Sequence, residues 1–371
     1  MKVGSYHICR ELLLLGHSVL YVSTPVSIFH LFKYFNGPIN RKSIKDSLSL
    51  IYGKNTIING KCIDYIPFTF FPYLKLPFLD SRINVLHLSK ITFPTIKSIL
   101  EKYNFQNADL VLLDYPYLAF MKQFINSENW IYRITDNYSK FSNSPNSLPL
   151  VENYINSFVN KIIVTSSPSK IMVRNRWKRE SFLIENGVDL NLIENKNLEY
   201  PNEFEVNKKK VIYVGAFDKD RFDWQLLIEV ANLCLEVNFY LIGPYNKFNS
   251  RKIPDNIFML GPKKYEDLPI YYKNSDIGIL PLKKGGANEG RSPMKLYEYG
   301  IFKLPVVSTF TEELKTRGHE FLLLSNNASE FSKNIYKALN NKLKLGEIAY
   351  SISIQNSWKQ KTHELLTFAM D

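Results

Sequence analysis

Short apolar runs that alternate with helical patterns recur along the whole of this 371-residue chain. Such alternation is typical of α/β units that build parallel sheets, whose strands are buried on both faces and carry few polar positions. The runs fall into two series: 18–23, 108–113, 130–134, 161–165 and 181–184, then 210–215, 238–242, 257–260, 277–280 and 305–308. The sequence therefore predicts an α/β chain with two doubly wound, Rossmann-like domains.

A polar stretch that ends in three lysines separates the two series. We predict an N-terminal domain, a linker, a C-terminal domain and a closing helix at 1–193, 194–209, 210–350 and 351–371. Doubly wound sheets bind ligands at the carboxyl ends of their strands, which predicts a cleft between the domains. The closing helix is expected to cross back towards the N-terminal domain, because one apolar face needs a groove: Trp358, Thr362, Leu365, Leu366 and Ala369.

The chain opens on a glycine turn and a helical pattern, Gly4 and then Ile8, Leu12 and Leu13. A doubly wound domain normally begins with a strand before that turn. We favour the interpretation that the first strand is missing; the alternative is that the helix comes first.

Composition excludes several classes of protein. The chain is 45% hydrophobic, yet no apolar run approaches the ~18 residues of a membrane span, and the start lacks a signal-peptide pattern. The few, widely spaced cysteines, Cys9, Cys62 and Cys234, predict reduced thiols in a cytoplasmic protein.

The net charge of +12 has three interpretations. Nucleic acid is not expected as a partner, since no nucleic-acid-binding motif is present. A second interpretation is attraction to an anionic membrane or to a phosphate-rich substrate. A third is that the lysines reflect the base composition of an AT-rich genome. The aromatic and lysine-bearing segment 66–96 suits the inner membrane surface, or else a buried excursion of the N-terminal domain.

One motif carries the chemistry of a binding site. Ser292 is a good N-cap and Pro293 a good first helical residue, so a helix is predicted to start there. A helix N-terminus binds anions such as a diphosphate, and Lys295 adds a full positive charge. Glu298, one turn on, is able to accept hydrogen bonds from ribose hydroxyls. The alternative is a plain capped helix with a solvated lysine.

The run 289–298, followed by Tyr299 and 304–307, resembles the donor signature of GT-B glycosyltransferases, and most of all the GT4-like enzymes and the teichuronic-acid and GumK-type glucuronosyltransferase group. Further similar motifs extend the resemblance from Gly4 to the C-terminus: 185–189, 213–217, 241–244, 260–261 and 357–358.

The resemblance implies roles for individual residues. Glu298 matches the ribose ligand and Glu289 the sugar-side glutamate, although eight residues separate them here and seven in the family. Asn288 or Arg291 is the alternative on the sugar side. The implied diphosphate site comprises Gly215, Ser292, Pro293, Met294 and Lys295. Lys303 stands where the family usually has glycine after this helix, and Gly300 comes earlier. An end to the helix that differs from the family's is therefore an open alternative.

Asp218-Lys219-Asp220 resembles the metal-binding motif of GT-A transferases, but it follows the first strand of a second domain. In a GT-B enzyme the helix dipole and basic side chains replace the metal. We therefore expect no metal and no cofactor, with the nucleotide sugar as substrate.

Asp136 ends a predicted strand of the N-terminal domain and is the candidate catalytic base, able to deprotonate an acceptor hydroxyl. Its alternative is a loop or N-cap aspartate. Asp114, at the end of the neighbouring strand, is the reserve candidate, and His7 is a further acceptor-side candidate.

The leading hypothesis is sugar transfer from a nucleotide-sugar donor to an acceptor hydroxyl, with a lipid-linked saccharide of cell-surface polysaccharide biosynthesis as acceptor. Because of Asp136 we favour inversion, whereas GT4-like members are largely retaining. Two alternatives are a nucleotide-sugar epimerase of the same fold and a degenerate, non-catalytic scaffold.

Overall fold

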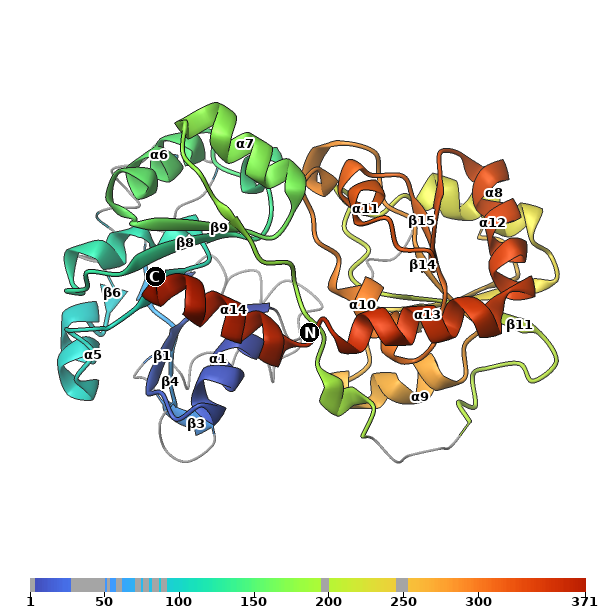
Figure 1. Ribbon diagram of the computed structural model, residues 1–371, viewed down its shortest axis with the longest axis horizontal. Helices are drawn as coiled ribbons and strands as arrows, with labels where there is room; N and C mark the ends of the chain where they lie inside the picture. Colours follow the sequence, from blue (N-terminus) through green and yellow to red (C-terminus); the bar gives the residue numbers. More distant parts are fainter. Residues whose placement is uncertain are drawn as a thin grey trace. The chain divides into compact units, whose positions relative to one another are not determined.

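The computed structural model describes residues 4–27, 51, 54–57 (backbone alone), 62–70, 75, 80–81, 87, 92–194, 200–244 and 253–371 (Figure 1). These residues fall into two compact units, each built from separate stretches of the chain. Unit 1 comprises Met1–Gly4, Thr165–Ser169 and Glu185–His363. Unit 2 comprises Ser5–Val164, Lys170–Ile184 and Glu364–Asp371.

Six parallel strands form the sheet of unit 1, in the order β13-β12-β11-β14-β15-β16. They are β11 Lys209–Val214, β12 Val237–Ile242, β13 Ile257–Gly261, β14 Ile277–Leu280, β15 Val306–Thr309 and β16 Leu322–Ser325. The first strand of this sheet, β11, lies in its middle. The chain then adds β12 and β13 on one side, and β14 to β16 on the other side of β11. The strand order therefore reverses between β11 and β14, the place where doubly wound sheets bind ligands.

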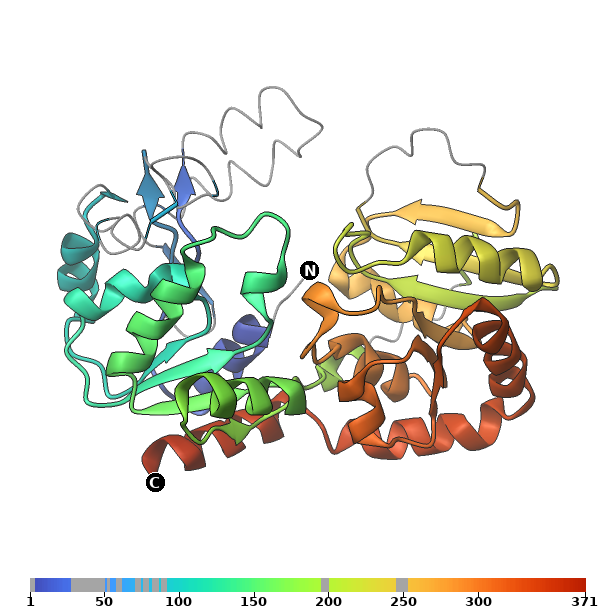
Figure 2. The same ribbon diagram turned by 90° about the horizontal axis from the view of Figure 1, so that it is seen from above.

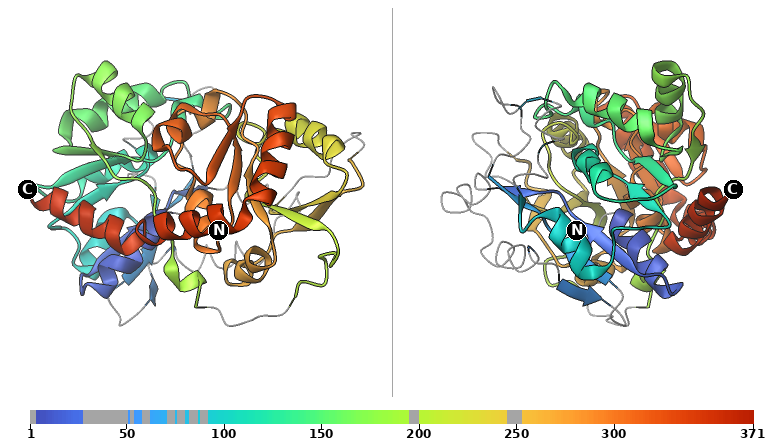
Figure 3. Two further views of the ribbon diagram at one scale, coloured as in Figure 1. Left: turned by 45° about the vertical axis from the view of Figure 1, so that its right-hand side comes forward. Right: turned by 90° about the vertical axis from the view of Figure 1, so that its left-hand side faces the viewer.

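Helices cover both faces of this sheet (Figure 3). Residues of α9 (Leu268–Lys273), α10 (Met294–Ile301) and α13 (Lys342–Ile354) share one apolar cluster with Ile212 and Val214 of β11. Residues of α8 (Trp224–Leu233) and α12 (Ala328–Asn340) share another with Val211 and Tyr213. Successive side chains of Val211–Val214 thus enter opposite layers, which is why this part of β11 is apolar at every position.

Unit 2 is built around four parallel strands in the order β10-β9-β8-β7. They are β7 Val111–Leu113, β8 Trp130–Ile134, β9 Lys161–Val164 and β10 Phe182–Leu183. A second sheet has the order β1-β4-β3 and a third the order β2-β5-β6. Their strands are β1 Val19–Val22, β2 Val26–Ser27, β3 Lys54–Ile57, β4 Cys62–Tyr65, β5 Phe68–Thr69 and β6 Thr92–Phe93.

The helices of unit 2 precede or connect these strands (Figure 2). They are α1 Gly4–Leu14, α5 Ile96–Tyr103, α6 Leu148–Phe158 and α7 Ser167–Trp177, with the 3₁₀ segments η2 Pro116–Gln123 and η3 Tyr138–Lys140. Helix α7 begins within a stretch assigned to unit 1. The prediction of a missing first strand stays a prediction.

Each of the ten predicted apolar runs overlaps a strand, and 130–134 and 277–280 coincide with β8 and β14. The closing segment differs from the prediction, since 351–371 is not one helix. Helix α13 ends at Ile354 and a new helix, α14 (Trp358–Met370), follows. The predicted apolar face of α14, from Trp358 to Ala369, is buried and thereby confirmed.

Segment 66–96 lies in large part outside the described residues, so its proposed membrane contact stays a prediction. Within the part of the chain that the structure describes, no helix combines the length and apolar character needed to cross a bilayer.

Candidate functional site

Two glycines bring backbone segments together at the carboxyl end of β11. Gly215 follows the strand, and its N–H donates to the carbonyl oxygen of Ile242 at 2.9 Å. Gly243 has φ +155°, and a Cβ there would come within 1.8 Å of the Gly215 carbonyl oxygen. Only glycine fits such an approach. The predicted site residue Gly215 therefore lies at the strand-order reversal, where backbone is available to a ligand.

Helix α10 begins one residue later than predicted. Pro293 is the N-cap, no side chain caps it, and the first helical residue is Met294. The Ser292 hydroxyl instead accepts hydrogen bonds from the Asn186 N–H at 3.2 Å and from Arg317 Nη2 at 2.7 Å. A hydrogen bond from a charged guanidinium is stronger than one from a neutral backbone N–H. This explains why the Ser292 hydroxyl bonds to Arg317 and does not cap the helix.

Lys295 and Glu298 form a buried ion pair on α10, with Lys295 Nζ 2.5 Å from Glu298 Oε2. Tyr272 of α9 donates to the same oxygen at 2.9 Å, and its own oxygen lies 3.4 Å from Lys295 Nζ. The two charged residues are only 7% and 4% exposed. Burial and the negative charge of Glu298 raise the pKa of Tyr272, so its phenol stays protonated and remains a donor. The predicted cation and ribose ligand thus meet in one cluster.

The first turn of α10 adds backbone donors to this cluster. The N–H groups of Met294 and Lys295 lie where a helix supplies no acceptor of its own. The positive end of the helix dipole is there as well. Backbone donors next to an ammonium group form a site that is able to bind a diphosphate.

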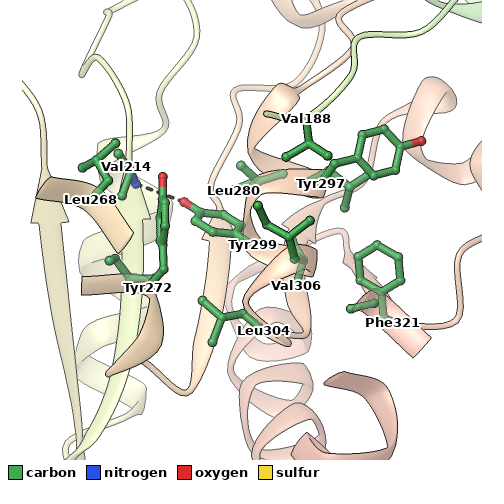
Figure 4. Packing of buried hydrophobic residues seen from close by; sticks show 14 of the residues in the cluster. Val188, Val214, Leu268, Tyr272, Leu280, Tyr297, Tyr299, Leu304, Val306 and Phe321 are labelled. Atoms are coloured by element: carbon green, nitrogen blue, oxygen red, sulfur yellow. Dashed lines mark hydrogen bonds between the residues drawn. The ribbon is translucent and has the colours of Figure 1, made fainter. Parts of the chain in front are cut away.

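Tyr299 fixes α10 to the sheet (Figure 4). Its hydroxyl accepts a hydrogen bond from the N–H of Val214, the last residue of β11, at 3.0 Å. Its ring lies against Gly278 of β14, where a Cβ would come within 2.3 Å of the ring. Both strands that flank the reversal point therefore hold the helix.

The predicted sugar-side residues lie in the loop before α10. Asn288 is buried, and its Nδ2 donates to the carbonyl oxygens of Arg221 and Lys283, both at 2.8 Å. Its amide is therefore used to join two loops. Glu289 is exposed, and Arg291 is half-buried.

Gly290 of the same loop has φ +79°, and a Cβ there would come within 2.8 Å of Ser169 Oγ. Ser169 Oγ lies 3.5 Å from the Gly290 carbonyl oxygen. Ser169 belongs to the short stretch Thr165–Ser169 of unit 1, so this stretch supports the loop.

Sequence reasoning missed Arg221 and Tyr272. Burial raises the pKa of Tyr213 to about 12, while the positive charges of Arg291 and Arg221 lower it. The positive charges of both guanidinium groups therefore reach the side chain of Tyr213 on β11. The available signal for Arg221 was a basic residue soon after the glycine turn; Tyr272 had none, because it lies on a separate helix.

The run Asp218-Lys219-Asp220 forms a turn in which Asp218 Oδ1 accepts from the Asp220 N–H at 2.7 Å. Asp218 also pairs with Arg221 at 3.6 Å. Among the described residues there is no group of three or more His, Cys, Asp or Glu side chains suited to a metal ion.

In unit 2, the two candidate aspartates lie near one tyrosine at neighbouring strand ends. Asp114 Oδ2 forms an ion pair with the buried Arg133 at 3.2 Å. Asp136 is half-buried, and its carbonyl oxygen accepts from the Tyr138 N–H at 3.0 Å. Burial raises the pKa of Tyr138, and the negative charges of Asp136 and Asp114 add to this. The structure thus brings Asp114 and Asp136 to one edge of the sheet.

His7 is buried on α1, with its ring edge-on to that of Tyr6 at 5.6 Å between centroids. Burial raises the pKa of Tyr21 to about 12, and the charge of Asp114 adds to this while a hydrogen bond with Ser5 lowers it. The first turn of α1 is therefore near Asp114.

Comparison with known proteins now adds to this geometry. Residues 208–341, which hold the whole of the candidate donor site, match the family described as "Glycosyl transferases group 1". This segment is similar to a group 1 glycosyl transferase domain.

A curated relative is the putative teichuronic acid biosynthesis glycosyltransferase TuaH of Bacillus subtilis (strain 168), 28% identical over 133 residues. The match covers 34% of this chain and 33% of TuaH, so it spans about a third of that protein's length.

Solved structures match over nearly the whole chain. Sucrose-phosphate synthase from Thermosynechococcus elongatus superposes with a TM-score of 0.71 and 15% identity, covering 98% of this chain and 91% of that one. HepE from Anabaena, in complex with UDP and glucose, has a TM-score of 0.60 and 14% identity, covering 96% and 100%. The predicted fold class is confirmed: the chain has the GT-B fold with two Rossmann-like domains.

Proposed function

We propose that the protein is a glycosyltransferase that transfers a sugar from a nucleotide-sugar donor to an acceptor hydroxyl. The observation that carries the proposal is the buried cluster of Lys295, Glu298 and Tyr272 beside the strand-order reversal of a segment similar to a group 1 glycosyl transferase domain. Buried charge is costly, and an ion pair kept beside free backbone donors suits a polar, charged ligand.

Each part of the cluster has a role in the proposal. The N–H groups of Met294 and Lys295 and the Lys295 ammonium bind the donor diphosphate, while Glu298 accepts hydrogen bonds from the ribose. The Lys295 charge is balanced by Glu298 in the ion pair. An incoming diphosphate shares this ammonium group, and the second carboxylate oxygen of Glu298 serves the ribose.

On the acceptor side we assign the base to Asp136. Asp114 already pairs with the buried Arg133 at 3.2 Å, so its carboxylate is engaged within the protein. Asp136 follows β8 at the same sheet edge. Removal of the acceptor proton by Asp136 fits an inverting displacement.

A lipid-linked saccharide at the inner membrane face is the acceptor that we propose. The net charge of +12 favours approach to an anionic membrane, and the relative TuaH is named for teichuronic acid biosynthesis. Cytoplasmic location and peripheral membrane attachment belong to the same proposal.

Isothermal titration with UDP and GDP tests the donor site. We expect one of them to bind the wild type, and Glu298→Gln to weaken that binding by roughly tenfold, or about 1.4 kcal/mol. Glu347→Gln is the matched control, because Glu347 is an exposed carboxylate that pairs with Lys303. Equal affinity of wild type and Glu298→Gln would contradict the role of Glu298, and no binding of either nucleotide would contradict the proposal.

The reaction itself is tested by NMR of the anomeric proton after incubation with a donor panel and saccharide acceptors. Transfer with inverted configuration, lost in Asp136→Asn while nucleotide binding persists, is the expected result. Release of an epimerised sugar without acceptor would instead identify an epimerase.

A further inference from the structure

Arg317 is a buried cation in unit 1 that the proposed reaction does not use. It ends helix α11 (Glu312–Arg317), which Thr311 caps at its start and Gly318, at φ +61°, ends. Its side chain is only 2% exposed. A cation this deep in the protein requires partners, since desolvation of an unpaired charge is costly.

Two carboxylates balance the Arg317 charge. Nε and Nη2 donate to Glu313 Oε1 at 2.9 and 2.8 Å, and Nη1 lies 3.1 Å from Glu185 Oε2. Glu313 is one turn back on the same helix, whereas Glu185 is 132 residues earlier in the chain, 317 minus 185. The other oxygen of Glu313 accepts from the Ser167 N–H at 2.8 Å.

The remaining bonds of Arg317 reach the donor helix at two points. Nη2 donates to Ser292 Oγ at 2.7 Å, just before α10, and Nη1 donates to the Tyr297 hydroxyl at 3.1 Å, one turn into it. Tyr297 in turn donates to Glu185 Oε2 at 2.6 Å. These two attachment points bracket Lys295, the residue that binds the diphosphate in the proposed function.

A second residue completes the fixation of this loop. The Asn186 N–H donates to Ser292 Oγ at 3.2 Å and Asn186 Nδ2 donates to the Ser292 carbonyl oxygen at 2.8 Å. Both polar atoms of Ser292 outside its N–H are therefore bound. A purely stabilising ion pair would not need these bonds to α10, because Glu313 and Glu185 already satisfy the charge.

We infer that Arg317 is a positioning residue for the donor site: it sets where α10 starts and thereby where the Met294 and Lys295 N–H groups point. The inference rests on the proposed donor-binding function. A displacement of about 1 Å in such a group is enough to weaken ligand binding or catalysis strongly.

The test combines hydrogen exchange with nucleotide binding. Tyr297→Phe removes one hydroxyl and leaves the charges paired, so the protein is expected to fold. Arg317→Lys keeps the charge but loses the planar fork of donors. Lys315→Met, which removes an exposed cation from the same helix, is the control.

We expect amide exchange in the peptide 288–299 to rise roughly tenfold in Tyr297→Phe and Arg317→Lys, with β11 and β12 unchanged. UDP affinity, or GDP affinity if that nucleotide binds, is expected to fall by a similar factor, while Lys315→Met behaves as wild type. Exchange that is unchanged at 288–299, or raised equally throughout unit 1, would overturn the inference. A wild type that binds neither nucleotide contradicts the proposed function instead, and the exchange data still decide the role of Arg317.

Discussion

The ring of Tyr299 lies directly on the backbone of Gly278, with no room for a Cβ between them. The same tyrosine binds the last N–H of β11 through its hydroxyl. One side chain thus ties helix α10 to both central strands, and the position of the proposed donor site depends on a glycine in β14.

Gly278→Ala is expected to destabilise the protein by about 1–3 kcal/mol, because the added methyl group overpacks the contact with Tyr299. Urea unfolding measures this loss. Tyr299→Leu in the same chain should recover part of it, since the smaller side chain leaves space. Strictly additive effects of the two substitutions would show that the contact does not limit the packing.

Lys303 has φ +58° just after the end of α10. Left-handed backbone is unfavourable for a residue with a Cβ by about 1–2 kcal/mol. Lys303→Gly is therefore expected to stabilise the protein by about 1 kcal/mol in denaturant unfolding, net of the greater freedom of the unfolded chain. Lys303→Ala keeps the strain and loses the exposed pair with Glu347, so it should not stabilise. A gain in Lys303→Ala equal to that of glycine would contradict the backbone explanation.

His319 predicts a pH dependence of stability. Burial, and then the positive charge of Arg317, lower its pKa below the ordinary value near 6.5, while Glu185 acts in the opposite direction. The folded state therefore favours the neutral ring. Its contribution to stability is fully present above about pH 6.5 and is lost as the pH falls towards the lower pKa of the folded state. His319→Gln should flatten the profile of melting temperature in this range, and His17→Gln, at an exposed histidine, should not. Identical profiles for wild type and His319→Gln would refute the assignment.

Asn288 joins the loops around Arg221 and Lys283 through one amide nitrogen. Asn288→Asp replaces this donor by a carboxylate that faces two carbonyl oxygens. We expect a loss of about 1–3 kcal/mol in stability, the range for removing a partner from a buried polar group. Since a protonated carboxyl is able to donate, the loss should shrink at low pH, which thermal unfolding at pH 4 and pH 7 measures. A loss that is the same at both pH values would indicate that repulsion at the carbonyls is not the cause.

Local sequence patterns predict the strands of the sheets well where burial is complete. β8 and β14 coincide with predicted runs because each of their residues is apolar or shielded and both faces are covered. β4 was missed, because Cys62-Ile63-Asp64-Tyr65 is short and includes an aspartate. β16 was missed although Leu322–Leu324 is an apolar run.

The helical half of the donor motif was recognisable because its signals are local. Pro293, Lys295 and Glu298 lie within two helical turns. The i,i+3 spacing that pairs Lys295 with Glu298 is a property of the helix. The partners that complete the site are not local. Tyr272 is on α9 and Arg317 on α11, and only the tertiary fold brings them to α10. For the same reason the Ser292 cap was wrong: a distant guanidinium competes for its hydroxyl.

Unit 1 is built from separate stretches of the chain, which limits how the segment from residue 208 onwards can be moved between genes. A recombinant fragment that starts at residue 208 keeps all six strands of the sheet, yet it lacks Ser167, Glu185 and Asn186. Arg317 would then have one carboxylate instead of two, and Ser292 would lose both bonds from Asn186. A segment that begins at residue 208 therefore lacks partners of Arg317 and Ser292 that the structure places upstream. Any exchange by recombination, natural or engineered, has to carry along two short upstream pieces that the domain boundary leaves behind.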